Sequence, residues 1–422
     1  MAYSAYIAQV KDVKKDENSE NLYIAQVMEE GVIVGSDMQE GELVLYMPAD
    51  GAVERWFGDK FSLFRKNEDG TAQGGYLENT GQIKALKLRG LRSEGIAISL
   101  NKLLLVFPEL HKAKAGDELT TLGGAVFIKK YIPRSNKVVG QSKTSMKGKK
   151  RDGIKVPLFA QHIDTKQLMY NEDAFREGDI LHISLKMHGT SQRSMNTYAE
   201  LPNGFFRRLF HMKPKTKQMY VLGTRRTVIL DPQKNGGFYG NDSFRVPHHE
   251  RIKPFIEEGQ EIFYEIVGFT DGGAPIMPTC DNKLLKDKAF QKQFGTTTTF
   301  SYGCEPGTSE MYVYRITSNN GEKEWSPSQI EYWCNQAGVK MVPQVEVAQF
   351  TTWKDLTNRV NRYLEVLADP VGKTHIKEGV VVRILNRENF AAYKAKSFQF
   401  KVLEQIIKEV ADAPDMEEQQ EV

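Results

Sequence analysis

Hydrophobic and polar positions alternate over short stretches in the first 125 residues. Turn signals such as Glu68-Asp69-Gly70 and Gly123-Gly124 separate the stretches, which lie at Ala5 to Val10, Leu22 to Val27, Leu43 to Met47 and Gly95 to Ser99. Several short strands at this spacing predict a small barrel or sandwich, and a five-stranded OB-type barrel fits the length. We therefore expect residues 1–125 to form an OB-like, nucleic-acid-binding β-barrel, although the pattern alone does not separate this barrel from other small ones.

Strand-like segments also dominate residues 156–410, where longer patterns interrupt them. The predicted strands are Asp179 to Leu185, Tyr220 to Leu230, Glu261 to Val267, Met311 to Ile316 and Gly379 to Ile384. Helices are predicted at Pro327 to Gln336, Trp353 to Ala368 and Phe400 to Val410, because apolar residues recur at helical spacing, most clearly Leu356, Val360, Leu364 and Leu367. Strands with occasional helices predict an α+β domain with mostly antiparallel sheets.

The charge balance of the chain conceals two biased segments. The 422 residues are 40% apolar and 26% charged with a net charge of +3, which is typical of a folded globular protein. Phe127 to Lys155 holds ten Lys or Arg against Asp152, whereas Glu404 to Val422 holds seven acids against Lys408. We interpret 126–155 as a basic connector and 411–422 as an acidic disordered tail. The connector residues expected to contact nucleic acid are Lys129, Lys130, Lys147, Lys149, Lys150 and Arg151; a merely solvated linker is the alternative.

The cysteines and the apolar runs limit where the protein works. Cys280, Cys304 and Cys334 form no CxxC pair, which argues against a disulfide scaffold and for a reducing compartment. No leader-like segment begins the sequence, and the longest apolar runs fall far short of the ~20 residues of a membrane span. The expectation is a cytoplasmic protein with no membrane partner and no obligate protein partner.

Familiar nucleotide and metal motifs are missing from the sequence. Gly372-Lys373-Thr374 resembles the end of a P-loop, but Leu367 stands where the first glycine of that motif belongs. No GxGxxG follows a predicted strand, and no HExxH is present. P-loop, Rossmann and zincin chemistry are therefore excluded.

Five other segments carry charged residues at strand ends, in a consistent order. Lys186-Met187-His188-Gly189-Thr190 follows a predicted strand, and a lysine before a glycine turn can point into a cleft. The other segments are Gly223-Thr224-Arg225-Arg226, Phe263-Tyr264-Glu265-Ile266, Lys377-Glu378-Gly379-Val380 and Lys394-Ala395-Lys396. Carboxylates in or beside apolar strands are costly to bury without partners. Alternation with a period of two places Lys394 and Lys396 on one face.

Together these segments resemble motifs I, Ia, III, IV and V of the covalent nucleotidyltransferases, the superfamily of ATP-dependent ligases and mRNA capping enzymes. The Lys-x-His-Gly-Thr form of the first motif is similar to that of RNA ligases of the RNA-ligase-2 type. An OB-like domain before the catalytic domain resembles the Deinococcus RNA ligase group and its phage relatives. Two short segments also resemble that group: His162-Ile163-Asp164-Thr165 and the stretch from Leu88 to Gly95.

The resemblance implies a mechanism and a role for each matching residue. Lys186 would attack the α-phosphate of ATP to form a lysyl-AMP intermediate, which requires an unprotonated amine. Lys394 and Lys396 would lower its pKa and, with Arg225, neutralise the phosphates. Glu265 would hold the ribose, and Glu378 would approach the metal or the lysine. The remaining residues implied at the nucleotide are His188, Gly189 and Arg193, and the implied cofactors are ATP and Mg²⁺, with Mn²⁺ as its alternative.

Two parts of the match leave alternatives open. Members of the family stack an aromatic side chain on the adenine ring. The residue at the corresponding position of this sequence is Met311 or Tyr312. Residues 204–218 interleave aromatics with cations, including Arg207 and Arg208, and form either a nucleic-acid contact or a solvated hairpin.

The sequence therefore predicts an ATP-dependent RNA ligase that joins 5′-phosphate and 3′-OH ends of RNA or of an RNA-containing nicked duplex. It would act in the cytoplasm of a bacterial or phage-infected cell. The alternatives are a GTP-dependent capping guanylyltransferase, a DNA or mixed RNA–DNA nick ligase, and a non-catalytic RNA-binding protein.

Overall fold

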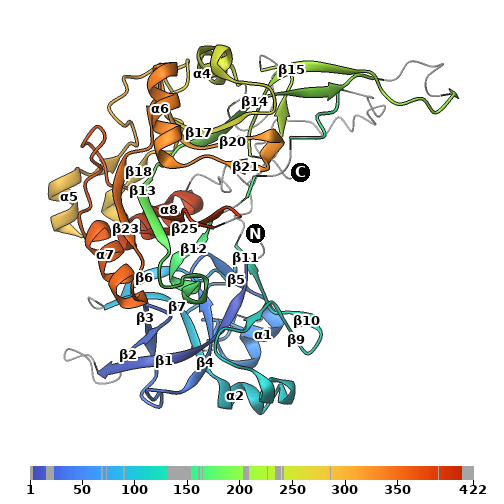
Figure 1. Cartoon of the computed structure of the whole chain (residues 1–422). Helices are drawn as coiled ribbons and strands as arrows, with labels where there is room; N and C mark the ends of the chain where they lie inside the picture. The colour runs from blue at the N-terminus through green and yellow to red at the C-terminus, as the bar shows by residue number, and fades with distance from the viewer. Residues whose placement is uncertain are drawn as a thin grey trace. The chain divides into compact units, whose positions relative to one another are not determined.

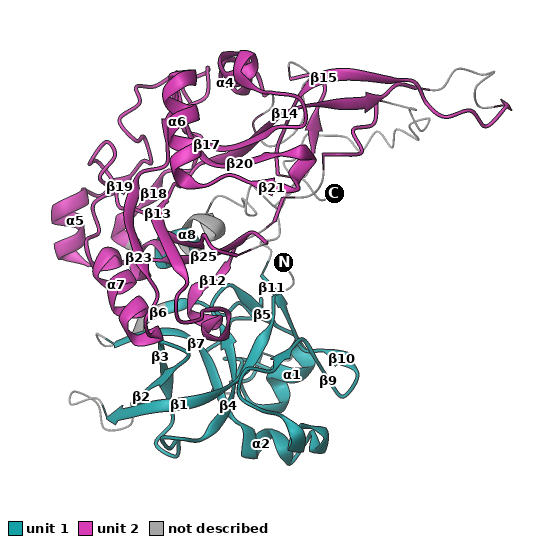
Figure 2. Ribbon diagram, viewed as in Figure 1, with its two compact units in different colours: residues 1–133, 401–409 teal, residues 134–400, 410–422 magenta. Residues whose placement is uncertain are grey.

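The chain folds into two compact units. The computed structural model describes residues 3–15, 23–67, 70–72, 74–88, 91–131, 154–159, 162–163, 165–202, 209–225, 227–232, 239, 242–285, 287–387 and 389–410. Unit 1 comprises residues 1–133 and 401–409, and unit 2 comprises residues 134–400 and 410–422 (Figure 2). The C-terminal segment 401–409 thus packs with the first part of the chain, which the sequence pattern does not predict.

Unit 1 is built on an antiparallel sheet that curls into a barrel-like shape (Figure 1). The strand order is β3-β2-β1-β4-β7-β6, and β8 pairs with the other edge of β1. These strands are β1 (Ala5–Lys15), β2 (Tyr23–Val27), β3 (Glu30–Val34), β4 (Leu43–Pro48), β6 (Ala85–Leu88), β7 (Leu91–Ser99) and β8 (Glu118–Leu119). The backbone N–H of Ile33 in β3 donates to Ser93 Oγ in β7 at 3.0 Å, so the sheet nearly closes on itself.

Shorter elements close the ends of this barrel. They are β5 (Gly51–Val53), α1 (Arg55–Lys60), α2 (Leu100–Leu104), η1 (Pro108–Lys112), β9 (Thr121–Leu122), β10 (Ala125–Val126) and β11 (Ile128–Lys130). The core beneath them is aliphatic and aromatic, with Phe57 and Phe127 in contact at 4.8 Å between ring centroids. The predicted β-rich first region is confirmed as a barrel-like sheet; its OB class stays a prediction.

Unit 2 contains two sheets that together hold the charged segments. One is a five-stranded sheet in the order β12-β25-β24-β13-β23. Its strands are β12 (Lys166–Gln167), β13 (Ile180–Lys186), β23 (Gln344–Gln349), β24 (Gly379–Ile384) and β25 (Ala391–Lys396). Each neighbouring pair is antiparallel except β12 with β25, which is parallel.

The second sheet of unit 2 has the order β16-β15-β14-β17-β20-β21, with β22 pairing in parallel with β20. Its strands are β14 (Thr190–Glu200), β15 (Thr216–Gly223), β16 (Val228–Ile229), β17 (Glu261–Gly268), β20 (Ser309–Ser318), β21 (Lys323–Glu324) and β22 (Lys340–Met341). One strand predicted over 220–230 is in fact two, because the chain turns between β15 and β16.

Helices connect these strands, and most of the last helix belongs to unit 1. They are α4 (Val246–Ile252), α5 (Lys288–Phe294), α6 (Pro327–Ala337), α7 (Trp353–Glu365) and α8 (Phe398–Val410), with a small hairpin of β18 (Cys280–Asp281) and β19 (Thr297–Thr298). Six short 3₁₀ turns also occur: η2 (Leu168–Tyr170), η3 (Glu172–Ala174), η4 (Ser243–Arg245), η5 (Lys253–Phe255), η6 (Asn282–Leu285) and η7 (Asn319–Gly321).

The helices predicted from the sequence are confirmed, and local signals explain their ends. Helix α6 begins with a capping box between Ser326 and Gln329 and ends at Gly338 in the left-handed conformation. Helix α7 begins at the N-cap Thr352 and buries Leu356 and Val360 against the five-stranded sheet. The α+β class is likewise confirmed, with parallel pairings that make the sheets of unit 2 mixed. Among the described helices, none has the length and apolar character that crossing a membrane demands.

Candidate active site

Both sheets of unit 2 contribute side chains to one pocket. From the five-stranded sheet, the alternate residues His182, Ser184 and Lys186 of β13 line it. Neighbouring strands add Val381 and Arg383 from β24 and Ala392 and Lys394 from β25. These side chains share one face because residues two apart on a strand point the same way.

Cross-strand register arranges this wall into three rows. Lys186 lies opposite Gly379, which lies opposite Lys396. The next row is Ser184, Val381 and Lys394, and the third is His182, Arg383 and Ala392. The first and third rows are about 13 Å apart along β13, at ~3.3 Å per residue. The pocket thus has a strongly cationic end and an opposite end that carries an imidazole.

Glu378 lies at the cationic end, one residue before β24. Its Oε1 is 2.9 Å from Lys186 Nζ and 3.2 Å from Lys396 Nζ. Burial by itself would raise the pKa of this carboxyl, which is 2% exposed, but the charges of Lys186 and Lys396 outweigh burial and lower the pKa below its usual value. Glu378 is therefore ionised at neutral pH, and its charge stabilises the ammonium form of Lys186.

The glycines beside these charged residues permit a close approach of the backbone. A Cβ on Gly379 would lie 1.9 Å from the carbonyl oxygen of Ala395, and one on Gly189 would lie 2.3 Å from that of Ile266. Neither position therefore accepts a larger side chain without a backbone shift. Gly189 thus lets the start of β14 lie close against β17, and it does not line the pocket.

His188 lies behind Glu378 and does not line the pocket. Its Nδ1 is 3.7 Å from Glu378 Oε2, and its ring contacts the rings of Phe300 and Phe400 edge to face, at 4.6 and 4.7 Å between centroids. The backbone N–H of His188 donates to the Tyr302 hydroxyl at 2.7 Å. His188 therefore supports Glu378 from the core side.

The second sheet supplies the facing wall. Ser191 of β14 lies opposite Glu265 of β17, and both line the pocket with Tyr314 of β20. The Tyr314 hydroxyl is 3.1 Å from Ser191 Oγ and 3.5 Å from His162 Nε2. Arg225, two residues beyond the end of β15, completes this wall. Of the predicted residues, the structure thus brings Lys186, Arg225, Glu265 and Lys394 to the pocket, with Glu378 and Lys396 directly at its cationic end.

The aromatic position differs from the sequence-based expectation. Met311 is fully buried in the core of the second sheet. Tyr312 is 4% exposed, and its ring lies 5.6 Å from the ammonium of Lys340. Neither residue lines the pocket, whereas Tyr314, two positions along the same strand, does. The register of β20 against β17 shifts at Tyr314, because Phe263 pairs with Arg315 while Tyr264 pairs with Val313, and simple alternation along β20 therefore does not locate the residue at the pocket.

Arg193 is also placed away from the pocket. Its guanidinium is 1% exposed, lies 3.7 Å from the centre of the Phe159 ring and pairs with Glu261 at 3.0 Å. Burial is the main reason why the pKa of Glu261 is raised to about 7, although the charge of Arg193 opposes it. Arg193 is therefore a buried structural cation rather than a phosphate ligand.

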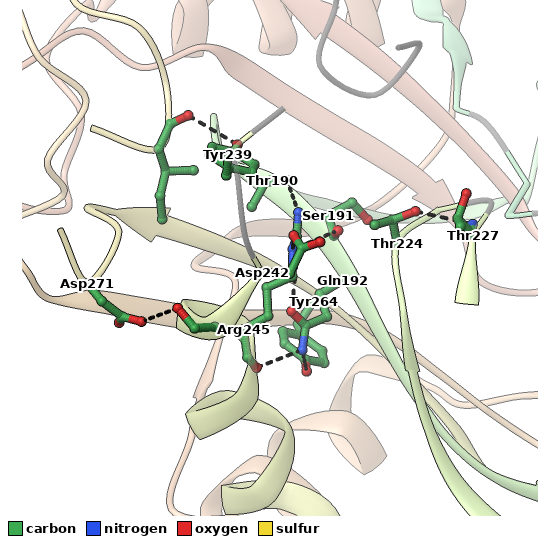
Figure 3. A network of polar contacts seen from close by, with 12 residues as sticks. Thr190, Ser191, Gln192, Thr224, Thr227, Tyr239, Asp242, Arg245, Tyr264 and Asp271 are labelled. Carbon is green, nitrogen blue, oxygen red and sulfur yellow. Dashed lines mark hydrogen bonds and ion pairs between the residues drawn. The ribbon is translucent and has the colours of Figure 1, made fainter. Parts of the chain in front are cut away.

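A buried polar network holds the start of β14 in place. Arg245, 1% exposed, donates to Thr190 Oγ1 at 2.8 Å, to the carbonyl oxygen of Ser191 at 3.2 Å and to Asp242 at 2.8 Å (Figure 3). Gln192 Nε2 donates back to the carbonyl oxygen of Arg245 at 3.1 Å. This network orients the strand that carries Ser191 into the pocket.

Sequence reasoning missed the end of the pocket opposite Lys186. His182 is 4% exposed, and its Nε2 has no hydrogen-bond partner among the described residues. Burial, followed by the charge of Arg383, lowers its pKa to about 4, so the imidazole is neutral. Arg383 lies 5.1 Å from the ring centre of Phe390, which also lines the pocket. The period of two in β13 and β24 was the available signal for His182, Ser184 and Arg383.

The remaining predicted contacts fall on unit 1 or outside the described residues. Lys129 and Lys130 belong to β11, and Lys129 pairs with Glu54 at 2.6 Å while its side chain stays 62% exposed. Lys147, Lys149, Lys150, Arg151, Arg207 and Arg208 lie outside the residues that the structure describes, as does the acidic tail.

Within the described ranges, no three His, Cys, Asp or Glu side chains gather as metal ligands. Glu378 Oε2 is nevertheless buried and lacks a hydrogen-bond partner among those residues. A single carboxylate oxygen fits a Mg²⁺ or Mn²⁺ ion that is bound mainly through phosphates and water. The site therefore suits a metal that arrives with a nucleotide.

The fold is similar to that of solved RNA ligase structures from Naegleria gruberi. A lysine-to-methionine variant with AMP and Mn aligns with a TM-score of 0.59 and 14% identity, covering 94% of this chain and 97% of that one. The same ligase with PPi aligns with a TM-score of 0.59 and 14% identity, covering 97% and 99%. A scan of protein-family models matches no family, and a search of curated proteins gives no match. At this identity the likeness establishes the fold, and the activity is argued from the pocket.

Proposed function

We propose that this protein is an ATP-dependent RNA ligase that works through a lysyl-AMP intermediate. The observation that carries the proposal is the buried Glu378 carboxylate between Lys186 and Lys396, at one end of a pocket whose first and third rows lie about 13 Å apart. Similarity of fold to RNA ligases solved with AMP and Mn supports the same class of chemistry.

The pocket suggests an orientation for the nucleotide. The α-phosphate would lie at Lys186, with the remaining phosphates toward Lys396 beside it and toward Lys394 in the next row, while Arg225 offers a further cation on the facing wall. The ribose would lie between the sheets near Glu265. The base would reach the third row, where His182 can hydrogen-bond its edge and the rings of Tyr314 and Phe390 offer apolar faces.

In the first step, the Lys186 amine would attack the α-phosphorus, forming a phosphoramidate bond to AMP as the bond to pyrophosphate breaks. The amine must lose its proton first, and the 2.9 Å contact with Glu378 opposes this loss. The ion pair must therefore weaken when the nucleotide binds. A divalent ion held by Glu378 Oε2, phosphates and water supplies charge neutralisation when bound.

Two further displacements would complete ligation. An oxygen of an RNA 5′-phosphate would attack the AMP phosphorus, which frees Lys186 and forms a pyrophosphate link between AMP and the RNA end. A 3′-OH would then attack the RNA phosphorus, releasing AMP and losing its proton. Lys394 and Lys396 would stabilise the negative charge that develops in each step. We include Lys129 and Lys130 among the proposed nucleic-acid contacts, since both offer cationic side chains on β11.

Intact-mass measurement after incubation with Mg²⁺ and ATP tests this proposal directly. We expect a mass increase of one AMP in the wild-type chain and none in Lys186→Ala, while Lys354→Ala, which removes an exposed lysine of α7, behaves as wild type. Pretreatment with pyrophosphate would remove AMP acquired during expression, because the first step is reversible.

Other outcomes of the same assay would select another function. An adduct from GTP alone would favour capping-type chemistry. An adduct from ATP followed by sealing of only DNA nicks would favour a DNA ligase. No adduct from a folded, unmodified chain would overturn the proposal and favour a non-catalytic RNA-binding role.

A further inference from the structure

The outer halves of β14 and β15 form a two-stranded ribbon that extends beyond the rest of their sheet. β14 pairs with β17 only from Thr190 to Met195, whereas its pairing with β15 continues to Glu200 (Figure 1). Two-stranded ribbons contribute little independent stability. The ribbon is thus an appendage whose exposed face is available for binding.

One face of the ribbon exposes aromatic rings. Tyr198 and Tyr220 are 44% and 41% exposed, and Tyr198 pairs with Gln218 while Tyr220 pairs with Asn196. Cross-strand partners and residues two apart share a face, so both tyrosines lie on the same side of the ribbon. Gln218 Nε2 donates to Asn196 Oδ1 at 3.1 Å between them. Two rings are thereby held on the face of the ribbon opposite Lys217, which pairs with Ala199.

The return half of the ribbon is cationic. Between Glu200 and Asp231 the sequence contains no acidic residue. Lys213, Lys215 and Lys217 are exposed, and neither Lys215 nor Lys217 forms an ion pair with any described residue. The nearby acids are Glu200, half-buried at the outer end of β14, and Glu258, which accepts from Gln218 at 3.4 Å.

Large apolar side chains are exposed next to these lysines. Leu209, Phe210 and Met212 are 58%, 68% and 50% exposed. Phosphates attract the lysines, and the faces of unpaired bases stack on exposed aromatic rings, so this combination suits single-stranded nucleic acid. An acidic protein would satisfy the lysines but would leave the exposed Phe210 ring without a specific partner.

The ribbon also leads directly to the active-site pocket. β15 carries Lys217 near its start, ends at Gly223 and is followed by Arg225 in the pocket wall. The eight steps along the chain from Lys217 to Arg225 span about 26 Å at ~3.3 Å per residue. At about 3.4 Å per nucleotide of a stacked strand, this path corresponds to roughly eight nucleotides.

We infer that the β14–β15 ribbon binds the single-stranded RNA segment that leads into the active site. Its lysines contact phosphates, Phe210 stacks on a base, and the strand follows β15 toward Arg225. This inference rests on the proposed ligase function for the identity of the bound strand. Nucleic-acid binding by the ribbon is measurable whether or not the protein ligates.

Fluorescence anisotropy with labelled 5′-phosphorylated RNA of 5 and 20 nucleotides tests the inference on the full chain. The test variant is Lys213→Gln/Lys215→Gln/Lys217→Gln. The matched control is Lys288→Gln/Lys292→Gln/Lys354→Gln, which removes three exposed lysines of helices α5 and α7 in the same unit. We expect the test variant to bind the 20-mer about tenfold more weakly at 0.1 M salt, with the control close to wild type.

The salt dependence of RNA binding separates the loss of phosphate contacts from a general change in the net charge of the protein. Each lost phosphate contact lowers the slope of log K against log salt by about 0.7 for a single strand, so the test variant should lose about 2. The 5-mer should show a much smaller difference, since it does not span the path. Phe210→Ala should weaken 20-mer binding severalfold without changing the slope, while Leu209→Ala should have little effect.

Three results would overturn the inference: equal binding of RNA by both triple variants, an equal effect on the two RNA lengths, or binding by the wild type only to anionic vesicles. The last result would assign the ribbon to a membrane surface. AMP adduct formation, measured on each variant, keeps the two proposals separate. An adduct-forming variant with weak RNA binding supports the ribbon, and a wild type that forms no adduct but binds RNA through the ribbon contradicts only the ligase proposal.

Discussion

The two units each bury a cluster of three charged groups, and the clusters have opposite compositions. In unit 2 a carboxylate, Glu378, lies between Lys186 and Lys396. In unit 1 a lysine, Lys401, lies between Glu30 of β3, at 2.8 Å, and Glu94 of β7. The first cluster has an excess positive charge beside an open pocket, whereas the second has an excess negative charge carried by two strands of the barrel-like sheet.

The pKa shifts of the two clusters differ accordingly. Two cations outweigh burial at Glu378 and lower its pKa. At Glu30, burial raises the pKa to about 8, because Lys401 only partly compensates and Glu94 adds to the rise. A cluster that keeps unmatched positive charge is prepared for an anionic ligand. The cluster of Lys401, Glu30 and Glu94 can instead neutralise itself by taking up a proton, and it serves the structure of unit 1.

Breaking the cationic cluster should have the largest effect. Glu378→Gln preserves the shape of the side chain but removes the charge between two lysines and the oxygen that fits a metal. We expect the rate of AMP adduct formation to fall roughly 1,000-fold, the size of losing one preorganised electrostatic contact at an active site. Timed intact-mass measurements with Glu305→Gln, an exposed carboxylate, as the control would check this; a near-normal rate would remove Glu378 from the chemistry.

Breaking the cluster of unit 1 should affect stability instead of chemistry. Lys401→Met leaves Glu30 and Glu94 together without a cation, which should cost about 3 kcal/mol, at the low end for a broken buried pair because Glu30 can bind a proton. Thermal unfolding and hydrogen exchange of β3 and β7 would measure the loss. Adding Glu30→Gln should restore part of it, and an Lys401→Met protein that exchanges like the wild type would contradict the prediction.

The dependence of the stability of unit 1 on pH tests the same difference between the two charged clusters. The folded-state pKa of Glu30, about 8, lies above the ordinary value of 4.5, so the folded state binds more protons between these values. The contribution of Glu30 to stability is therefore fully present below about pH 4.5 and is lost as pH rises toward 8. Protection of β3 and β7 should fall between pH 5 and 8 in wild type and change less in Glu30→Gln; a rise over this range would reverse the sign of our argument.

The smallest expected effect lies at the other end of the pocket. His182→Phe keeps a ring but removes the buried Nε2, so adduct formation from ATP should slow about tenfold while that from GTP changes little. The selectivity should stay constant between pH 8 and 5.5, because the pKa of His182 is about 4. His111→Phe, an exposed histidine of unit 1, is the control. An equal fall with both nucleotides would indicate a structural role only.

Local sequence signals account for most of the secondary structure. The capping box at Ser326 and the N-cap at Thr352 specify where α6 and α7 begin, and alternation identifies β13 and β24. The charged motifs also identify the cationic end of the pocket, since Lys186, Glu378 and Lys396 lie at the ends of these strands. In each case the signal depends only on residues close in sequence.

Position within a sheet was less predictable. The pairing register between β17 and β20 shifts between Phe263 and Tyr264. Glu265 lies opposite Tyr312, yet the tyrosine that lines the pocket is Tyr314. Arg193 looks from the sequence like a phosphate ligand, yet its partner Glu261 belongs to another strand. Such pairings depend on long-range register, which the spacing of residues in one strand does not reveal.

The sequence by itself determined the α+β composition, most strands and helices, and the set of charged residues that suggests nucleotide chemistry. The tertiary structure decided which of them share a pocket, that Glu378 lies between two lysines, that His182 lies at the opposite end and that Lys401 joins unit 1. The physical reason is that alternation and capping act over a few residues, whereas ion pairs and pocket walls unite residues hundreds of positions apart. Their geometry exists only after the sheets have formed.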